Sequence, residues 1–547
     1  MPRVMPTVYG SDGHAHAYDG GPNLIVAASN ASGIAKATAT YLCDGTADDV
    51  EINAAIAALP AGGGKVVLSE GTFTVTAAIT PTANTSIEGQ GQLATAVKCE
   101  TAGINVIEMH GADVNNFLTG ITLSNFRIYT SGAVASIGLS LKYAKTNMFD
   151  NLDIRDFTSN AIRIQGCYDN RYRNVYISGC GHVATTKSAI SLENLADQNV
   201  NNENFLQVFM EPYTYRALNI GADSGANIAH FNRFTACKFH GDETQTGPAI
   251  VIAGDMNIFT SLEISKTGAA ATGVQITSAG VGNLFTDVVV GNDVGTVFDI
   301  DGDYNVVNGA HCAAEAVTFA DISGAGNQLA NLTLLGMTGE FITVSGNNNR
   351  LTGIGLQGGS ETGMTISGHY NSLSDITMDS VPKGGIILSG NQNVLNGVSP
   401  FWVADTSGEA CAVTGDGNQI FGGTFNGNDT ETITFAAGAD NNLVMGAQVG
   451  KAITNSGAGN RFIRVIGFVT ENSGTGSIAN GATTAVITHG LAVTPTVDDI
   501  SVTLAENPTN TPGAIWVDTI TATQFTVNCE NDPGASGLDF GWRAMVL

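Results

Sequence analysis

The stretch GNNNRLTGIGLQGG, residues 346–359, decides the fold because it is one copy of a repeat that runs through most of the chain. The copy is anchored on Asn349, and hydrophobic residues follow it two, five and seven positions later. The last two hydrophobic residues have the two-residue period of a strand rather than the period of a helix. The copy therefore predicts short strands separated by turns.

The anchor asparagine recurs with a period in the twenties, which indicates a solenoid. From Asn283 to Asn393 the anchors are 22 residues apart five times in succession. A unit of this length with short strands and turns is one coil of a parallel β-helix, since the dense leucine framework of a leucine-rich repeat is missing. The anchors are Asn147, Asn170, Asn204, Asn232, Asn257, Asn283, Asn305, Asn327, Asn349, Asn371, Asn393, Asn418, Asn441 and Asn460.

These asparagines have a structural explanation. Asparagine tolerates the left-handed backbone conformation of a turn. Stacked at equal positions, its amides can hydrogen-bond from coil to coil. We therefore assign the anchors to coil stacking and not to catalysis.

The amino-acid composition is consistent with a β-solenoid, and the net charge limits the classes of partner that the protein can bind. Glycine supplies 68 of the 547 residues and charged residues only 13%, which excludes a charged coiled coil and an ordinary helix-rich enzyme. The hydrophobic share of 43% argues against bulk disorder. The net charge of −27 disfavours binding to nucleic acid or an anionic membrane. The same charge is compatible with binding to neutral or cationic glycans and with bound Ca²⁺. We expect that the protein requires no cofactor.

Targeting signals and cysteines are uninformative about chemistry. No window holds 18 apolar residues, so no transmembrane helix is predicted. The N-terminus lacks the charged-then-apolar order of a secretory signal, and a protein that works outside a cell would then leave it by assembly or lysis. The eight cysteines form no CxxC motif, and we interpret them as small buried apolar residues.

Ahead of the repeats, CDGTADDVEINAAIAALPAGGGKVVLSEGTFTV, residues 43–75, predicts a capping helix followed by strands. Asp48 is a candidate N-cap with Glu51 three residues on. The helix would lie over the open edge of the first coil, and strands are expected at Lys65–Leu68 and Thr72–Val75. Its apolar face would comprise Ile52, Ala55, Ile56 and Leu59.

This segment resembles the start of the pectate-lyase-like β-helix superfamily, whose pattern is DGxTDD, an alanine-rich helix, GGGxVxxPxGxY and a later LxGxG. The resemblance covers residues 43–100, and the repeats extend it to about residue 466. It implies a right-handed parallel β-helix. The family includes lyases, glycoside hydrolases, and phage tailspikes and depolymerases, so the fold does not choose an activity. The matching positions are Asp44, Gly45, Asp48, Asp49, Gly62–Gly64, Val66, Gly71, Phe73 and Glu88–Gly91, while Ser69 and Glu70 stand where proline is usual.

Four regions follow from these patterns. Residues 1–35 form an N-terminal arm, residues 36–100 the cap, residues 101–466 the parallel β-helix, and residues 467–547 a C-terminal β-sandwich. The sandwich resembles the C-terminal modules of phage fibres and tailspikes, which trimerise or bind receptors. In the arm, His14 and His16 lie near Asp12 and Asp19, which would suit Zn²⁺ or Ni²⁺. We favour a flexible or docked arm that would face a larger particle, and we assign no metal site.

The outward columns of the solenoid locate a candidate site at residues 150–265, where large and ionisable side chains and long insertions coincide. Six positions after each anchor, the column reads Asp153, Tyr176, Met210, Lys238 and Glu263. Eight positions after, it reads Arg155, Ser178, Pro212, His240 and Ser265.

Glycoside hydrolysis needs two carboxyl groups roughly 5–10 Å apart, and the catalytic candidates are Glu211, Glu263, Asp242 and Glu243. Glu211 falls seven positions after Asn204, where side chains point inward. Partial burial would favour the protonated form that a general acid needs. The alternative is a slipped register that leaves Glu211 at the turn with Pro212.

The substrate-binding candidates can stack on sugar rings or hydrogen-bond to them. Tyr213 and Tyr215 are two residues apart and would share a strand face, although packing in the core or between subunits would also explain them. The full set is Asp153, Arg155, Tyr176, Tyr213, Tyr215, Lys238 and His240.

These candidates favour a virion-associated tailspike or depolymerase that binds and hydrolyses a host surface polysaccharide. β-Elimination on a uronic-acid polymer is an alternative, with Arg155, Lys238, His240 and Tyr176 as candidate groups. A structural fibre or glycan-binding adhesin without catalysis is another. The tailspike resemblance also implies a homotrimer located on a virion or outside the cell. From the acidic charge and the lack of a long apolar window we expect no nucleic-acid partner and no membrane insertion.

Overall fold

The computed structural model describes residues 23–546 except 183, 222–228, 243, 266–270, 292–293, 314–315, 402–408, 427–430 and 506. The chain divides into two compact units, residues 1–306 and 307–547. No helix in the described part of the chain is long and apolar enough to cross a membrane. His14 and His16 lie outside the described residues.

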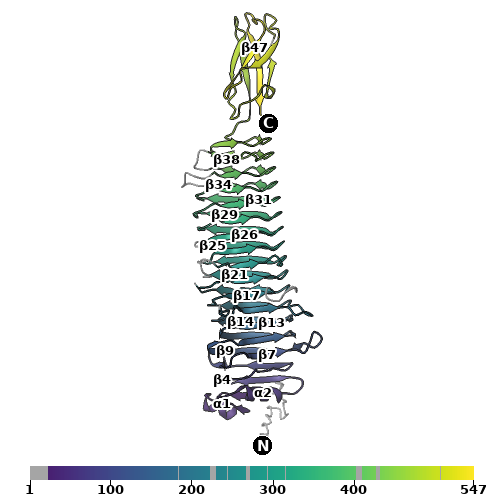
Figure 1. Cartoon of the computed structure of the whole chain (residues 1–547), viewed down its shortest axis with the longest axis vertical. Helices are drawn as coiled ribbons and strands as arrows, with labels where there is room; N and C mark the ends of the chain where they lie inside the picture. Colours follow the sequence, from purple (N-terminus) through teal and green to yellow (C-terminus); the bar gives the residue numbers. More distant parts are fainter. Residues whose placement is uncertain are drawn as a thin grey trace, which may run out of the picture. The chain divides into compact units, whose positions relative to one another are not determined.

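The first unit begins with the predicted cap (Figure 1). Strand β1 (Asn23–Ala27) pairs in parallel with β2 (Tyr41–Leu42) and β3 (Gly64–Leu68). Strand β1 lies within the segment that the sequence assigns to the arm, and helix α1 (Gly33–Thr38) begins at the end of that segment and extends into the predicted cap. Helix α2 (Asp49–Ala57) buries Ile52, Ala55 and Ile56 as predicted.

Asp48 is the N-cap residue of α2, as predicted, but its side chain makes no capping hydrogen bond, so the predicted capping box does not form. Its two carboxylate oxygens instead accept hydrogen bonds from the backbone N–H groups of Gly45 at 2.8 Å and Thr74 at 2.7 Å. Asp48 therefore ties the start of α2 to strand β4 (Gly71–Val75).

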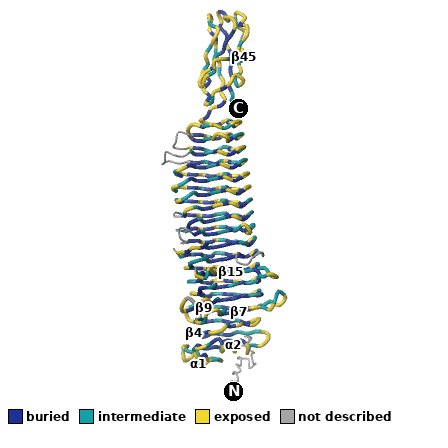
Figure 2. The backbone as a smooth tube through the Cα atoms, viewed as in Figure 1, coloured by how far each residue is buried: buried dark blue, intermediate teal, exposed yellow. Residues whose placement is uncertain are grey.

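Two parallel sheets form the solenoid of the first unit, and their strands lie one above another, with buried residues along the successive coils (Figure 2). In the copy at Asn257, the side chains of Phe259, Leu262 and Ile264 are buried as predicted. The first sheet contains β1 to β4 and β5 (Thr85–Glu88), β6 (Thr95–Cys99), β9 (Thr122–Val134), β12 (Met148–Phe157), β14 (Arg171–Ser178), β16 (Asn204–Met210), β18 (Arg233–Thr235), β19 (Lys238–His240), β21 (Ile258–Ser265) and β23 (Leu284–Val290). The second contains β7 (Asn105–His110), β10 (Ile137–Lys142), β13 (Ile162–Gln165), β15 (Ser188–Glu193), β17 (Arg216–Ile220), β20 (Ile250–Ile252), β22 (Val274–Ile276) and β24 (Thr296–Ile300), and a short pair is made by β8 (Leu118–Thr119) and β11 (Ala144–Lys145).

The predicted asparagine ladder is present in this unit. The amide of Asn257 donates to Asn283 Oδ1 at 3.0 Å, and the amide of Asn283 donates to Asn305 Oδ1 at 3.0 Å. A second stack lies two residues after the ladder, where Tyr172 and Phe205 have ring centroids 4.4 Å apart. Both stacks match the spacing of hydrogen-bonded strands.

One coil departs from the pattern. Glu203, not Asn204, occupies the ladder position: its backbone N–H donates to Asn232 Oδ1 at 3.0 Å, and its carboxyl accepts from the Asn170 amide at 2.9 Å. The sequence alone does not reveal this substitution because Asn204 stands next to Glu203. Every position counted from Asn204 is therefore one residue out of register.

The second unit continues the same parallel architecture and ends in a β-sandwich. Asn327 and Asn349 donate their backbone N–H groups to Oδ1 of Asn349 and Asn371, both at 2.7 Å, which confirms the predicted stacking of these three coils. Near its end the ladder residue is Asn442 rather than the predicted Asn441. The solenoid strands are β25 (Val306–Ala313), β27 (Gln328–Leu335), β29 (Arg350–Gln357), β31 (Ser372–Asp379), β33 (Val394–Asn396), β34 (Ser399–Phe401), β36 (Gln419–Phe421), β39 (Leu443–Met445) and β42 (Arg461–Ile463) in one sheet, β26 (Thr318–Ile322), β28 (Ile342–Val344), β30 (Met364–Ile366), β32 (Ile386–Leu388), β35 (Cys411–Val413), β38 (Glu431–Phe435) and β41 (Ala452–Asn455) in the other, and the pair β37 (Thr424–Phe425) and β40 (Gln448–Val449).

The C-terminal sandwich is built from two antiparallel three-stranded sheets. Ile478 and Phe540 from one sheet and Phe525 and Val527 from the other form a common core. The strand order of the first sheet is β43 (Glu471–Ile478), β48 (Leu538–Met545), β45 (Ile500–Leu504). The strand order of the second is β44 (Thr484–Thr488), β47 (Gln524–Cys529), β46 (Ile515–Asp518). A short 3₁₀ turn, η1 (Val497–Asp499), lies between β44 and β45 in the sequence. All eight cysteines of the chain are buried and unbridged, as the sequence predicts.

Candidate functional site

The candidate site lies on the outer face of the first sheet in the first unit, toward the carboxyl ends of its strands. Parallel register places Asp153 beside Tyr176, Tyr176 beside Phe209, Phe209 beside Lys238, and Lys238 beside Glu263. Phe209 takes the place that the sequence assigns to Met210, because Glu203 is the anchor of that coil. Phe209 is exposed and Met210 is buried.

The same shift of register moves Glu211. The prediction that Glu211 occupies an inward position is wrong, since its side chain is 32% exposed. It follows Met210, which pairs with Phe239, and so lies in the outward column beside His240. The alternative that the sequence left open, a slipped register next to Pro212, is the arrangement observed.

Lys238 brings two of the catalytic candidates together. Its Nζ is 3.4 Å from Glu211 Oε2 and 3.6 Å from Glu263 Oε1. Because both distances meet at one nitrogen, the two carboxylate oxygens are at most about 7 Å apart, an upper limit that is compatible with glycosidase carboxyl pairs. Partial burial alone would lower the pKa of Lys238, but Glu263 and Glu211 outweigh it, and the pKa is raised.

A hollow of about 570 Å³ opens beside this pair. It is lined by Tyr176, Glu211, His240 and Asp242 among others. His240 Nδ1 is 3.9 Å from Glu211 Oε2 and 3.3 Å from Ser265 Oγ. The hollow therefore presents a carboxylate, an imidazole and an aromatic ring to a ligand.

Asp242 is less suited to proton donation. Its Oδ1 accepts hydrogen bonds from the side chain of Thr244 at 2.7 Å and from the backbone N–H of Thr244 at 2.8 Å. These bonds lower the pKa of Asp242 and favour the ionised form. Glu243, the fourth catalytic candidate, lies outside the described residues.

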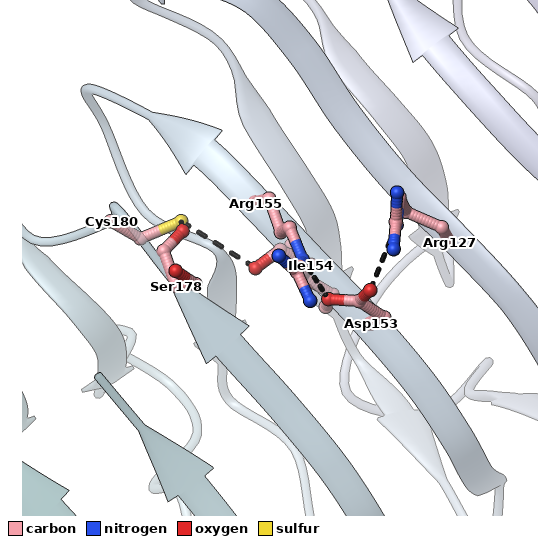
Figure 3. Close-up of polar contacts among 6 residues, drawn as sticks. All are labelled: Arg127, Asp153, Ile154, Arg155, Ser178 and Cys180. Carbon is pink, nitrogen blue, oxygen red and sulfur yellow. Dashed lines mark hydrogen bonds and ion pairs between the residues drawn. The ribbon is translucent and has the colours of Figure 1, made fainter. Parts of the chain in front are cut away.

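Asp153 holds two arginines in the coil of the site that comes first in the sequence (Figure 3). The Nε of Arg127 donates to its Oδ2 at 2.8 Å and the Nε of Arg155 to its Oδ1 at 2.7 Å, and the Asp153 side chain is only 2% exposed. The Arg155 guanidinium lies 4.9 Å from the centroid of the Tyr176 ring. Asp153 thus positions Arg155 over one face of Tyr176.

We did not single out Asp156 from the sequence, although it lies only three residues after Asp153 on β12. Its carboxyl lies beside Gly179, where an added Cβ would come within 2.5 Å of Asp156 Oδ1. Partial desolvation of this carboxyl raises the pKa of Asp156. Asp156 lies nine residues after the anchor Asn147, one position beyond the outward column that lies eight residues after each anchor. Extending the count by one position would have included it.

The two tyrosines of EPYTYRAL do not share a strand face, so that prediction is wrong. Residues 211–215 form a connection rather than a strand. Tyr213 is buried in the core, and burial raises its pKa far above the ordinary value. Tyr215 is half-buried, with the Arg216 guanidinium 5.0 Å from its ring centroid.

One group of potential metal ligands occurs among the described residues. Donor atoms of Cys43, Asp48 and Glu51 lie within 4.8 Å of one another at the start of α2. Both oxygens of Asp48 already accept backbone N–H groups. Burial and the neighbouring Asp48 raise the pKa of the Cys43 thiol, so the group has the properties of a structural tie in the cap.

No protein-family model matches the chain, and no curated protein matches it. Among solved structures it is similar to ORF18 of Geobacillus virus E2, at 16% identity over 89% of this chain and 74% of that chain, with a TM-score of 0.36. It is also similar to the GH87 alpha-1,3-glucanase of Streptomyces thermodiastaticus, at 15% identity over 65% and 67%, with a TM-score of 0.40. Tailspike protein 3 of bacteriophage CBA120 aligns at 10% identity over 86% and 63%, with a TM-score of 0.34. At these values the likeness concerns the β-solenoid alone.

Proposed function

We propose that this protein binds a polysaccharide in the hollow beside Glu211 and hydrolyses it with Glu211 and Glu263. The observation that carries the proposal is the shared contact of both carboxylates with Lys238 Nζ, at 3.4 and 3.6 Å. It fixes two carboxyl groups from different coils at a separation that glycoside hydrolysis can use. They lie on a rigid sheet, which favours precise placement.

In the free protein, the ammonium group of Lys238 contacts both carboxylates and offsets part of their negative charge. A polysaccharide in the hollow offers hydroxyl oxygens to that ammonium group and draws it away from the pair. Glycoside hydrolysis needs one carboxyl group as the acid and the other as the base or nucleophile. We assign proton donation to the leaving glycosidic oxygen to Glu211, and the base or nucleophile to Glu263, the more exposed of the two at 49%.

Elimination is less well supported by the same contacts. A lyase base must be unprotonated, but the two glutamates raise the pKa of Lys238 and keep it charged. Arg155 is held by Asp153 at 2.7 Å, so its guanidinium group is engaged and not free to act as the base. The resemblance of residues 43–100 to β-helix proteins of the tailspike type supports placing the activity on a particle that recognises host glycans.

The test is release of reducing ends from a panel of neutral and acidic polysaccharides by the full chain. Glu211→Gln and Glu263→Gln are each expected to lower the rate at least about a hundredfold. Glu361→Gln is the matched control, because Glu361 is also paired with a lysine, Lys383, but lies far along the sequence on the other unit. Full cleavage by both site variants would refute the assignment, and products carrying an unsaturated uronate would identify a lyase instead.

A further inference from the structure

Residues 140–240, which hold most of the candidate site but not Asp242 or Glu263, are much less acidic than the rest of the chain. Residues 140–240 carry ten of the 22 lysines and arginines together with nine acidic residues, whereas the whole chain has a net charge of −27. The stretch is thus nearly neutral overall. Some of its arginines have no anionic partner among the residues that the structure describes, so they can make the surface around them positive. Two of them share a groove away from the candidate site.

This groove has a volume of about 700 Å³ and lies where the strands of the first sheet begin. Arg171, Asn204 and Arg233 are the first residues of β14, β16 and β18, and the register pairs Arg171 with Asn204 and Asn204 with Arg233. The two arginines are therefore two strand spacings apart, about 10 Å at their backbones. The rest of the lining includes amide and hydroxyl side chains, among them Asn202 and Thr146, together with Met148.

Both arginines are exposed, and among the described residues neither side chain has an ion pair or hydrogen bond. Arg173, two residues along β14, shows the contrast, since it forms a two-pronged contact with Asp150 at 2.6 and 2.9 Å. The groove also contains one carboxylate, Asp169, at its exposed rim. Two unpaired guanidinium groups against one carboxylate leave the groove positive.

We propose that this groove is a second binding site, which takes the carboxylate or sulfate groups of an acidic polysaccharide. A guanidinium fork binds such oxyanions through paired hydrogen bonds. The amide and hydroxyl lining suits sugar hydroxyl groups, which both donate and accept. An extended glycan advances by about one strand spacing per sugar, so Arg171 and Arg233 would meet acidic groups on alternate residues. The acidic surroundings oppose long polyanions such as nucleic acid and favour a short-range contact.

The second site is distinct from the hydrolytic candidate. The hollow and the groove have no described lining residue in common, and Arg171 and Tyr176 lie five residues apart on β14, at most about 17 Å along the strand. The proposal therefore stands whether or not Glu211 and Glu263 cleave a glycan. A bound acidic chain at the strand beginnings would anchor the protein on a polymer that the other edge of the sheet processes.

Binding of fluorescent oligogalacturonate, a dextran sulfate fragment and neutral dextran to the full chain tests the inference. The first two probes separate carboxylate from sulfate recognition. We expect at least one of them to bind, neutral dextran to bind at least tenfold more weakly, and the affinity to fall as salt is added. The double variant Arg171→Gln, Arg233→Gln is expected to weaken binding at least tenfold, with an unchanged melting temperature because both side chains are exposed.

Two variants serve as controls. Arg350→Gln removes an exposed arginine from the same strand-start position of another coil, where its neighbours are Gln328 and Ser372; it should bind like the wild type. Glu211→Gln should also keep binding, which separates this site from the hydrolytic one. Unchanged binding in the double variant, equal losses in Arg350→Gln or Glu211→Gln, or equally tight binding of oligo-dT or poly-L-glutamate would each overturn the proposal.

Discussion

Replacing Glu203 by glutamine should make the stability of the first unit less sensitive to pH. Glu203 is fully buried in a ladder otherwise made of asparagines, and its carboxyl accepts the Asn170 amide at 2.9 Å. Burial raises the pKa of Glu203 from 4.5 to about 8. The folded protein therefore holds this carboxyl as the neutral acid at pH 7, where the unfolded chain ionises it.

The sign and size of the effect follow from this difference. Below pH 4.5 both states are protonated and the raised pKa costs nothing. Above that pH only the unfolded chain releases the proton, so folding loses about 1.4 kcal/mol per pH unit. The loss reaches about 3 kcal/mol at pH 7 and about 5 kcal/mol near pH 8, where the folded protein also ionises and the curve levels off. Glutamine has the same length, cannot ionise and still offers an oxygen to Asn170.

The assay is the free energy of unfolding in guanidinium chloride at about pH 5, 7 and 8.5. The advantage of Glu203→Gln over the wild type should be smallest at the lowest pH and grow by several kcal/mol. Glu361→Gln, at a partly exposed carboxyl, should show no such growth. A difference between Glu203→Gln and the wild type that stays flat across this range would refute the reasoning, as would a variant that becomes the less stable one at high pH.

Two further substitutions test the stacking of the coils. Gly368→Ala places a Cβ 1.9 Å from the Gly346 carbonyl oxygen and should destabilise the second unit by about 1–3 kcal/mol, measured by thermal unfolding. The control is Gly355→Ala, whose Cβ would have no atom closer than 3.7 Å, and it should lose less than half as much stability in the same experiment. Asn371→Ala removes the oxygen that accepts the Asn349 backbone N–H at 2.7 Å and should cost about 1–3 kcal/mol, measured by chemical unfolding and by faster amide exchange at Asn349; undiminished protection of that amide would contradict the ladder.

The fold was predictable because its determinants repeat. An inward side chain recurs at the same place in each coil, so Asn349 and Leu351 carry the same information as their counterparts in every other copy. Cap strands and the buried face of α2 also followed from local pattern. Asp48 did not, because whether a carboxylate caps its own helix or reaches the backbone of Thr74 depends on a strand 26 residues away.

The candidate site was only partly predictable, since the outward columns do not repeat. Lys238 and Glu263 fell where the count from their own anchors placed them, and the structure joins them at 3.6 Å. Nothing in the sequence indicates that Asp153 lies covered between Arg127 and Arg155, since both contacts depend on how long side chains fold over a neighbouring coil. The predicted position of Tyr213 was wrong for a related reason, because the segment that contains it turns inward instead of extending a strand.

Glu203 shows why a single position decides the interpretation of a whole coil. In a strand, a shift of one residue exchanges the inward and outward faces. Counting from Asn204 hid Glu211 inside the solenoid and exposed Met210, while the true anchor, Glu203, does the reverse. The one acidic residue in the ladder thus belongs to the same coil as the carboxylate that Lys238 holds on the surface. Substituting Glu203 should therefore disturb stability without removing a group from the hollow, because its carboxyl lies on the inward side and that of Glu211 on the outward side.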